Sequence, residues 1–244
     1  MSYTTLRYET VGDIATIQLL QPYSDMNMVR ELTQVCNHLE DENSASFVIL
    51  RGSDGTFNKG IDFQEFRPDQ PMDIHGFNKW EKICVRLERL PKITIAILEG
   101  DVVGGGFQLA LLADYRIAAS NTTFQLPEVH QGFLPGMAVF RLAKFIGLGH
   151  AKRLILFSEQ VRAQEAKDLG FVDEISNTPE GSITALVQKA QPVNHTTIQL
   201  AKRLLNESFH DSFEDAIGHF LAAQHRCISQ TPFLQTLKNE KSSS

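Results

Sequence analysis

Three consecutive glycines are the first residues of this chain whose type and spacing could do chemistry. Gly104, Gly105 and Gly106 stand between an apolar, β-branched run at 93–97 and a run of strong helix formers at 107–113. A strand, a glycine turn and a buried helix leave backbone N–H groups available where the helix begins. Such groups can stabilise an oxygen that becomes negative during a reaction.

The same glycines have two other interpretations. A tight turn that lets a helix pack closely on a strand is the commoner use of a glycine run. A phosphate cradle is the second, but no Gly-Lys-Ser/Thr follows, and Leu109 stands where a dinucleotide motif has its third glycine. The glycine spacing alone therefore leaves the alternatives open.

Glu128 is a candidate acid or base. It lies between Leu126-Pro127 and Val129, and burial in apolar surroundings raises the pKa of a carboxyl group toward the range of a general base. A surface glutamate is the alternative interpretation. His130 would face the same way as Glu128 if the segment is extended, so it is a secondary acid–base candidate, with a structural histidine as the commoner alternative.

Several motifs follow one another in the order that is typical of one family. Pro127-Glu128, the run Gly132-Phe133-Leu134-Pro135-Gly136 and the stretch 162–174 come after the glycine turn. The chain resembles the crotonase family, also called the enoyl-CoA hydratase/isomerase superfamily, from its first strands to Ile175 and more loosely to its end. The resemblance implies an α/β fold, a crotonase-like ββα superhelix (spiral), with a C-terminal helical trimerisation region.

The resemblance also implies an oxyanion hole. Family members usually show a small residue, a glycine, any residue and then an aspartate, and the N–H of the residue after that glycine donates to the thioester oxygen. Carried over by position, the two donors are the N–H groups of Ile61 and Gly105, with Glu128 as the acid/base. Lys59, before Gly60, departs from the usual small residue. It either alters the pocket on the adenine side of the substrate or turns outward.

Position 108 decides which reaction we expect. Hydratases of the family use two glutamates, and the one on the helix after the glycines is Gln108 here. An amide cannot take a proton at neutral pH, although it can hold a water or a polar group of the substrate; a structural amide satisfied by the backbone is an equal alternative. One carboxylate and an oxyanion hole suffice for proton shuttling, so we expect enoyl-thioester double-bond isomerisation with Glu128 as the single acid/base.

Other functions stay open as alternatives. A hydratase or dehydratase reaction is one. Residues 132–137 are similar to segments of crotonases in polyketide and other secondary metabolism, some of which decarboxylate glutaconyl thioesters, although those lack a residue like Glu128. Residues 80–91 are similar to crotonase-like accessory proteins of dihydroxyphenylglycine synthesis, which support a partner synthase and catalyse little themselves.

The remaining substrate-binding candidates follow from position and resemblance. We expect Asp62 to cap a following helix, Phe133 and Leu134 to line the acyl pocket, and Phe233 and Lys238 to touch the carrier bound by a neighbouring subunit. The substrate is expected to be an acyl-CoA or an acyl-carrier-protein thioester, so coenzyme A or phosphopantetheine enters as part of it and no separate cofactor is expected. The candidates are Lys59, Gly60, Asp62, Gly104, Phe133, Leu134, Phe233 and Lys238.

Composition limits the classes of function. The 244 residues, 42% hydrophobic and 21% charged, suit one sizeable domain or a core with an appended element. A net charge of −6 argues against nucleic-acid binding. Cys36, Cys84 and Cys227 are scattered, and no apolar leader or membrane-length run is present, so we expect a cytoplasmic protein without membrane contact. No histidine stands in metal-ligand spacing, and no metal site is expected.

The elements that position these groups follow from periodicity. Runs at 5–10 and 14–20 predict a hairpin, and the helix at 28–39 followed by a buried strand at 47–50 predicts parallel α/β layering. A helix at 78–90 is expected to pack through Trp80, Ile83, Val85 and Leu87. Later predictions are helices at 137–145, 150–157, 162–169, 196–205 and 212–224, and a linker at 176–182. The resemblance implies a crotonase-like core of residues 1–190 and a helical region of residues 191–244, which is expected to cover the active site as a lid and to build a homotrimer or a dimer of trimers.

Overall fold

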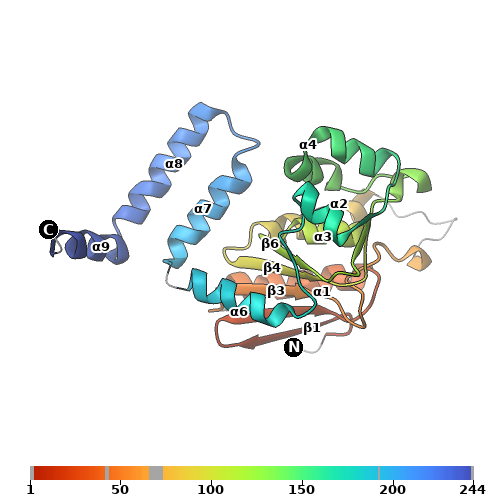
Figure 1. The fold of residues 1–244 in the computed structure, drawn as a ribbon, viewed down its shortest axis with the longest axis horizontal. Helices are drawn as coiled ribbons and strands as arrows, with labels where there is room; N and C mark the ends of the chain where they lie inside the picture. The colour runs from red at the N-terminus through yellow and green to blue at the C-terminus, as the bar shows by residue number, and fades with distance from the viewer. Residues whose placement is uncertain (1–2, 42–43, 66–73, 192, 243–244) are drawn as a thin grey trace. The chain divides into compact units, whose positions relative to one another are not determined.

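The computed structural model describes residues 3–41, 44–65, 74–191 and 193–242 (Figure 1). Tertiary contacts divide the chain into two compact units, Met1–Ala185 and Leu186–Ser244. We call them unit 1 and unit 2. The expected boundary at residue 190 lies within α6 (Pro179–Ala190).

A six-stranded sheet forms the centre of unit 1. Its order is β1-β2-β3-β4-β6-β9. The first two strands pair antiparallel, with Val11 opposite Ile14, which confirms the predicted hairpin. Every other pair is parallel, which confirms the predicted layering. The strands are β1 (Leu6–Val11), β2 (Ile14–Leu19), β3 (Phe47–Arg51), β4 (Ile93–Leu98), β6 (Tyr115–Ala118) and β9 (Glu174–Ile175).

Helices connect these strands, and several of their bounds differ from the predicted ones. Val85 is 37% exposed, and the prediction that it packs is wrong, because Cys84 occupies the buried face instead. The two helices predicted after residue 137 form one element that is kinked at Gly147. The second half of the predicted linker is helical, since α6 begins at Pro179, a residue suited to a first helical turn. The helices of this part are α1 (Met26–Asp41), α2 (Ile74–Glu88), α3 (Gly105–Leu111), α4 (Ala138–Leu156) and α5 (Ala163–Leu169).

A second, three-stranded sheet carries the glycine turn. It consists of β5 (Asp101–Val103), β7 (Thr123–Gln125) and β8 (Val161–Arg162), in the order β5-β7-β8. Strand β5 was not predicted, because it occupies only three residues between β4 and the glycines. The N–H of Gly104 donates to the carbonyl of Gln125 at 2.9 Å, so the turn is attached to β7.

An aromatic cluster holds α3 in place. All seven residues of α3 are buried. The ring of Phe107 on this helix packs against Phe124 at 5.3 Å and Phe171 at 5.0 Å between centroids. Such pairs contribute about 0.5–1.5 kcal/mol each beyond the area they bury. The cluster therefore fixes the helix whose first residues form the glycine turn.

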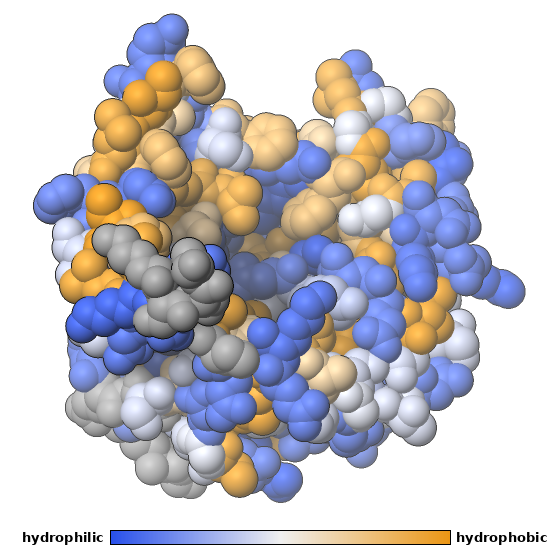
Figure 2. Space-filling view, turned by 60° about the vertical axis from the view of Figure 1, so that its left-hand side comes forward, coloured by the Kyte–Doolittle hydropathy of each residue, from blue (hydrophilic) through white to orange (hydrophobic). Residues whose placement is uncertain are grey.

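Unit 2 contains the end of α6 together with α7 (His195–Glu207), α8 (Phe213–Ile228) and α9 (Thr231–Ser242). Helices α7 and α8 were predicted, and the side chains of Asn194 and Ser212 cap them. Helix α9 was not predicted. None of the described helices is long and apolar enough to cross a membrane. Hydrophobic side chains, orange in Figure 2, are exposed in several places on the molecular surface.

Candidate functional site

A cavity of about 300 Å³ in unit 1 gathers many of the predicted residues. Its walls come from the loop after β2, the loop before the 3-10 helix η1 (Phe63–Glu65), the glycine turn, and the segment around the 3-10 helix η2 (Glu128–Gln131). The lining residues are Tyr23, Lys59, Gly60, Ile61, Phe63, Val103, Gly104, Pro127, Glu128, Gln131 and Phe133.

The loop at 58–62 presents one N–H group that has no acceptor among the described residues. The N–H of Lys59 donates to the carbonyl of Pro22 at 2.6 Å, and that of Asp62 to the carbonyl of Ser24 at 3.0 Å. The side chain of Asn58 accepts from the N–H of Gly60 at 2.9 Å. Within the described part of the chain, the N–H of Ile61 is the one left for a ligand in this run.

The glycine turn meets this loop directly. Gly60 and Gly104 both have positive φ, 91° and 55°. A Cβ on Gly60 would lie 3.4 Å from the nitrogen of Gly105, so the two backbone segments touch. The N–H of Gly105 is the first of α3 and has no partner within the helix. The geometry places the N–H groups of Ile61 and Gly105 on neighbouring backbone segments beside one cavity.

The carboxyl group of Glu128 packs against the glycine turn. The residue is 5% exposed, and a Cβ on Gly104 would collide with its Oε1. Its Oε2 is buried and has no hydrogen-bond partner among the described residues. A carboxyl oxygen without a partner at a cavity wall is available to exchange a proton with a ligand.

Burial sets the proton affinity of this group. Desolvation raises the pKa of Glu128 to about 7, and its own backbone N–H offsets only part of that effect. The carboxyl can therefore hold or release a proton near neutral pH. Such a value is suited to an acid/base that takes up and returns a proton in one reaction.

Gln108 lies away from the cavity lining and is 1% exposed. Its Nε2 donates to both carboxylate oxygens of Glu81 on α2, each at 3.0 Å. The amide of Gln108 is therefore satisfied within the protein, as the structural interpretation of this residue expected. Its partner is a side chain rather than the backbone.

Three other predicted residues are placed as follows. The segment that carries His130 is a 3-10 helix rather than extended, so His130 does not face the way Glu128 does, and its Nε2 lies 3.2 Å from the carbonyl oxygen of Leu156. Lys59 lines the cavity and forms an ion pair with Asp101 at 3.2 Å. Asp62 accepts from the N–H of Gln64 at 2.9 Å, which is the predicted cap.

Of the two residues expected to line the acyl pocket, one lines the cavity and the other does not. Phe133 lines the cavity, with its ring 5.8 Å from that of Phe63 in an edge-to-face arrangement. Leu134 is 69% exposed and is not part of the lining. Phe233 and Lys238 belong to α9 of unit 2, so their expected contact with a carrier stays a prediction.

Sequence reasoning missed Asn58, Tyr23 and Gln131. Asn58 is fully buried and shapes the loop through Gly60. An Asn two residues before a glycine is a local turn signal that could have identified it. Tyr23 and Gln131 line the cavity, and no sequence pattern marks them.

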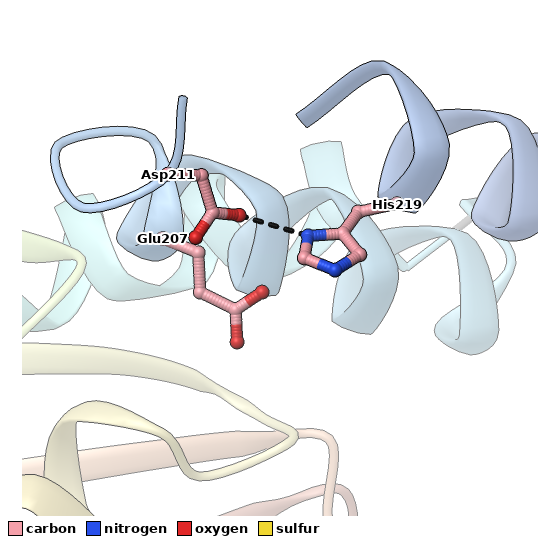
Figure 3. Close-up of side chains that lie close together, drawn as sticks. All are labelled: Glu207, Asp211 and His219. Carbon is pink, nitrogen blue, oxygen red and sulfur yellow. Dashed lines mark hydrogen bonds and ion pairs between the residues drawn. The ribbon is translucent and has the colours of Figure 1, made fainter. Parts of the chain in front are cut away.

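One acidic and histidine cluster lies in unit 2 (Figure 3). The ligand-type atoms of Glu207, Asp211 and His219 all lie within 4.8 Å of one another. His219 Nδ1 is 2.8 Å from Asp211, and Arg203 contacts Glu207 at 3.1 Å. The pair of His219 and Asp211 joins α8 to the turn after α7, whereas the pair of Arg203 and Glu207 lies within α7. The three residues are spaced over the turn between two helices, so no sequence motif revealed them.

Comparison with known proteins identifies the family of the chain. The family described as enoyl-CoA hydratase/isomerase matches residues 9–242. An enoyl-CoA-hydratase of Amycolatopsis orientalis is 30% identical over 200 residues, which cover 82% of this chain and 88% of the relative. A short-chain-enoyl-CoA hydratase of Clostridium acetobutylicum is 29% identical, with 94% and 91% covered.

Solved structures agree in fold. The crystal structure of an enoyl-CoA hydratase from Bacillus anthracis superposes with a TM-score of 0.89, at 24% identity, covering 98% of this chain and 97% of that one. This likeness confirms the predicted α/β crotonase-like fold.

Glu128→Gln should stabilise the protein at pH 8 and not at pH 5. A glutamate in the unfolded chain has a pKa of about 4.3, whereas the pKa of this carboxyl in the folded protein is about 7. The native state therefore binds more protons between these values, and its stability falls as the pH rises through them. Removing the charge should recover roughly 1–3 kcal/mol of unfolding free energy at pH 8. Denaturant unfolding at both pH values checks this; equal stability of variant and wild type at pH 8 would contradict it.

Gly104→Ala should disable the site while the fold survives. Its φ of 55° and ψ of −121° suit glycine, and the new methyl would displace the Glu128 carboxyl. We expect thioester C2 proton exchange to fall about 100-fold, because misplacement of about 1 Å costs that much. Gly149→Ala is the matched control, since nothing lies within 4 Å of a Cβ there. An unchanged rate in Gly104→Ala would show that the glycine does not position Glu128.

Proposed function

The chain belongs to the enoyl-CoA hydratase/isomerase family and is an enzyme of that family, and we propose that this member moves a double bond of an acyl thioester from the 3- to the 2-position. One observation carries the proposal. A single buried carboxyl, Glu128, faces the cavity beside the N–H groups of Ile61 and Gly105, while position 108 holds an amide that is bound elsewhere.

The proposed reaction uses Glu128 twice. Its carboxylate removes a proton from C2 of a 3-enoyl thioester, and the electron pair of the broken C–H bond moves onto the thioester oxygen. The N–H groups of Ile61 and Gly105 stabilise the resulting enolate. The protonated Glu128 then returns the proton at C4, and the double bond forms between C2 and C3. The residue ends in its starting state.

We propose that the coenzyme A or phosphopantetheine part of the substrate, its carrier arm, enters along the polar side of the cavity. Lys59 lines this side, and its ammonium group can exchange Asp101 for a phosphate of coenzyme A or of a carrier-bound phosphopantetheine. The apolar side carries the ring pair Phe63 and Phe133, which suits an acyl chain. The arm is part of the substrate, so the proposed reaction needs no separate cofactor.

Water addition is the second candidate, because the relatives at about 30% identity are named hydratases. It would want a base besides Glu128, and no second carboxylate belongs to the described cavity lining. The geometry therefore favours isomerisation.

We also propose that the protein is a homotrimer or a dimer of trimers through unit 2. Helices α7 and α8 contain no buried residue, although they carry large apolar side chains such as Phe213, 76% exposed, and Leu205, 71% exposed. Exposed apolar surface on this scale is typical of association sites.

Proton exchange tests the proposed reaction. In heavy water the wild type should incorporate deuterium at C2 and convert 3-enoyl-CoA to 2-enoyl-CoA. The exchange rate should rise with pH up to about 7, the pKa of Glu128, and then level off, because the carboxylate is the active form. The exchange rate of the Glu128→Gln variant should be about 100- to 10,000-fold lower than that of the wild type. Mass spectrometry of the thioester measures both effects.

Three outcomes would contradict the proposed reaction. Water addition that persists in Glu128→Gln would show that another group does the chemistry. Loss of carbon dioxide from a glutaconyl thioester without double-bond migration would favour the decarboxylase alternative. No detectable reaction with coenzyme A thioesters or carrier-protein thioesters, together with co-purification of a synthase, would favour an accessory role.

The mass of the protein in solution tests the assembly. Light scattering should give three or six times the chain mass, and Phe213→Glu should dissociate it, since a charge would then lie in an apolar interface. Glu214→Gln, in the same first turn of α8, is the control. A monomeric wild type at micromolar concentration would contradict the assembly.

A further inference from the structure

Glu81 is a carboxylate that collects donors from three elements around the site. It lies on α2 and accepts from Gln108 on α3, from the backbone N–H of Met137 at 2.9 Å, and from Arg141 on α4 at 3.5 Å. Met137 follows the loop at 132–136, whose Phe133 lines the cavity. One side chain thus joins α3 to a wall of the cavity.

The charges around position 108 are already unbalanced. Arg141 is 4% exposed and forms a two-pronged pair with Glu88, at 3.1 and 3.0 Å. Two carboxylates therefore share one guanidinium, and the neutral amide of Gln108 supplies Glu81 with its closest side-chain donor. A third carboxylate at this position, which is 1% exposed, would bury a charge beside two carboxylates of the same sign and remove that donor.

We propose that Glu81 is a specificity-determining residue: its carboxylate requires a neutral hydrogen-bond donor at position 108 and so keeps a second acid/base out of the site. The amide at 108 is then a consequence of its neighbour on α2. This inference rests on the proposed reaction, in which Glu128 works alone.

The geometry also indicates what would release the constraint. If the two residue types are exchanged, an amide at 81 can donate to a carboxylate at 108 across the same 3.0 Å contact. That carboxylate would lie against Gly136, because a Cβ there would approach the Gln108 side-chain oxygen closely. Gly136 belongs to the same loop as Phe133, and the N–H of Gln108 donates to the carbonyl of Gly104, which lines the cavity. The exchanged carboxylate would therefore lie next to the cavity wall, one helical turn from Gly104.

Four proteins test the inference: the wild type, Gln108→Glu, Glu81→Gln, and the exchange variant that carries both substitutions. At pH 8 the melting temperature of Gln108→Glu should be roughly 5–10 °C below that of the wild type. At pH 5 the gap should narrow, because burial beside Glu81 raises the pKa of the introduced carboxyl group. The titratable and charged groups packed around position 108 are Glu81, Cys84 and Glu88 on α2 and Arg141 on α4, with Lys144 beyond Glu88.

The exchange variant should recover most of the lost melting temperature at pH 8. It should also add water to a 2-enoyl-CoA roughly tenfold faster than the wild type, whereas Gln108→Glu alone should not. The control is Gln164→Glu. On α5 the exposed amide of Gln164 donates to Asp168 at 2.9 Å, so the same substitution faces a carboxylate in solvent, and its melting temperature should change by less than about 2 °C.

Either of two results would overturn the inference. The first concerns stability: Gln108→Glu is as stable as the wild type at both pH values, so that there is no loss for the exchange variant to recover. The other is equal water addition by the single and exchange variants. Failure of the proposed reaction would be seen separately, as absent C2 exchange in the wild type, because the melting comparison needs no substrate.

Discussion

The contact between the Glu128 carboxyl and the bare Cα of Gly104 is the constraint on which the rest of the site depends. It is possible only because residue 104 has no side chain and a φ of 55°. Oε1 of Glu128 lies at this contact, and Oε2 of the same carboxyl is buried without a hydrogen-bond partner among the described residues, which is costly in free energy. The core around it, including the aromatic cluster under α3, must supply the stability that this group removes. The same contact brings the carboxyl beside the two available N–H groups.

Two acidic side chains near the site differ in the hydrogen-bond donors that surround them. Glu81 is surrounded by donors from α3, α4 and the loop between them, so its charge is satisfied and it serves to position the structure. Oε2 of Glu128 has no donor among the described residues, and burial raises the pKa of this carboxyl to about 7. The difference in hydrogen bonding, rather than in residue type, separates a positioning carboxylate from one that can exchange protons.

The two units differ in how they use apolar side chains. Unit 1 encloses them between sheet and helices, and strands such as β3 and β4 are buried along almost their whole length. In unit 2, α7 and α8 expose theirs. Exposed apolar side chains of this size are suited to association, which agrees with the proposed oligomer.

The sequence by itself determined the family, the parallel layering, the hairpin at Gly12 and the segments that carry Gly105, Ile61 and Glu128. These depend on local periodicity, turn residues and motif order, which short stretches of chain encode. It did not reveal β5, α9 or the burial of Cys84 in place of Val85, because short elements and exact helix faces have weak local signals.

Tertiary structure alone decided the roles of the polar side chains. The partner of Gln108 lies 27 residues earlier in the chain, and the partner of Lys59 is Asp101 on another strand. His130 turned away from Glu128 because the segment closes into a 3-10 helix that ends at the left-handed Gly132. Hydrogen bonds and burial depend on residues that the fold brings together over long distances, so sequence could name the candidates while only packing determined which of them meet.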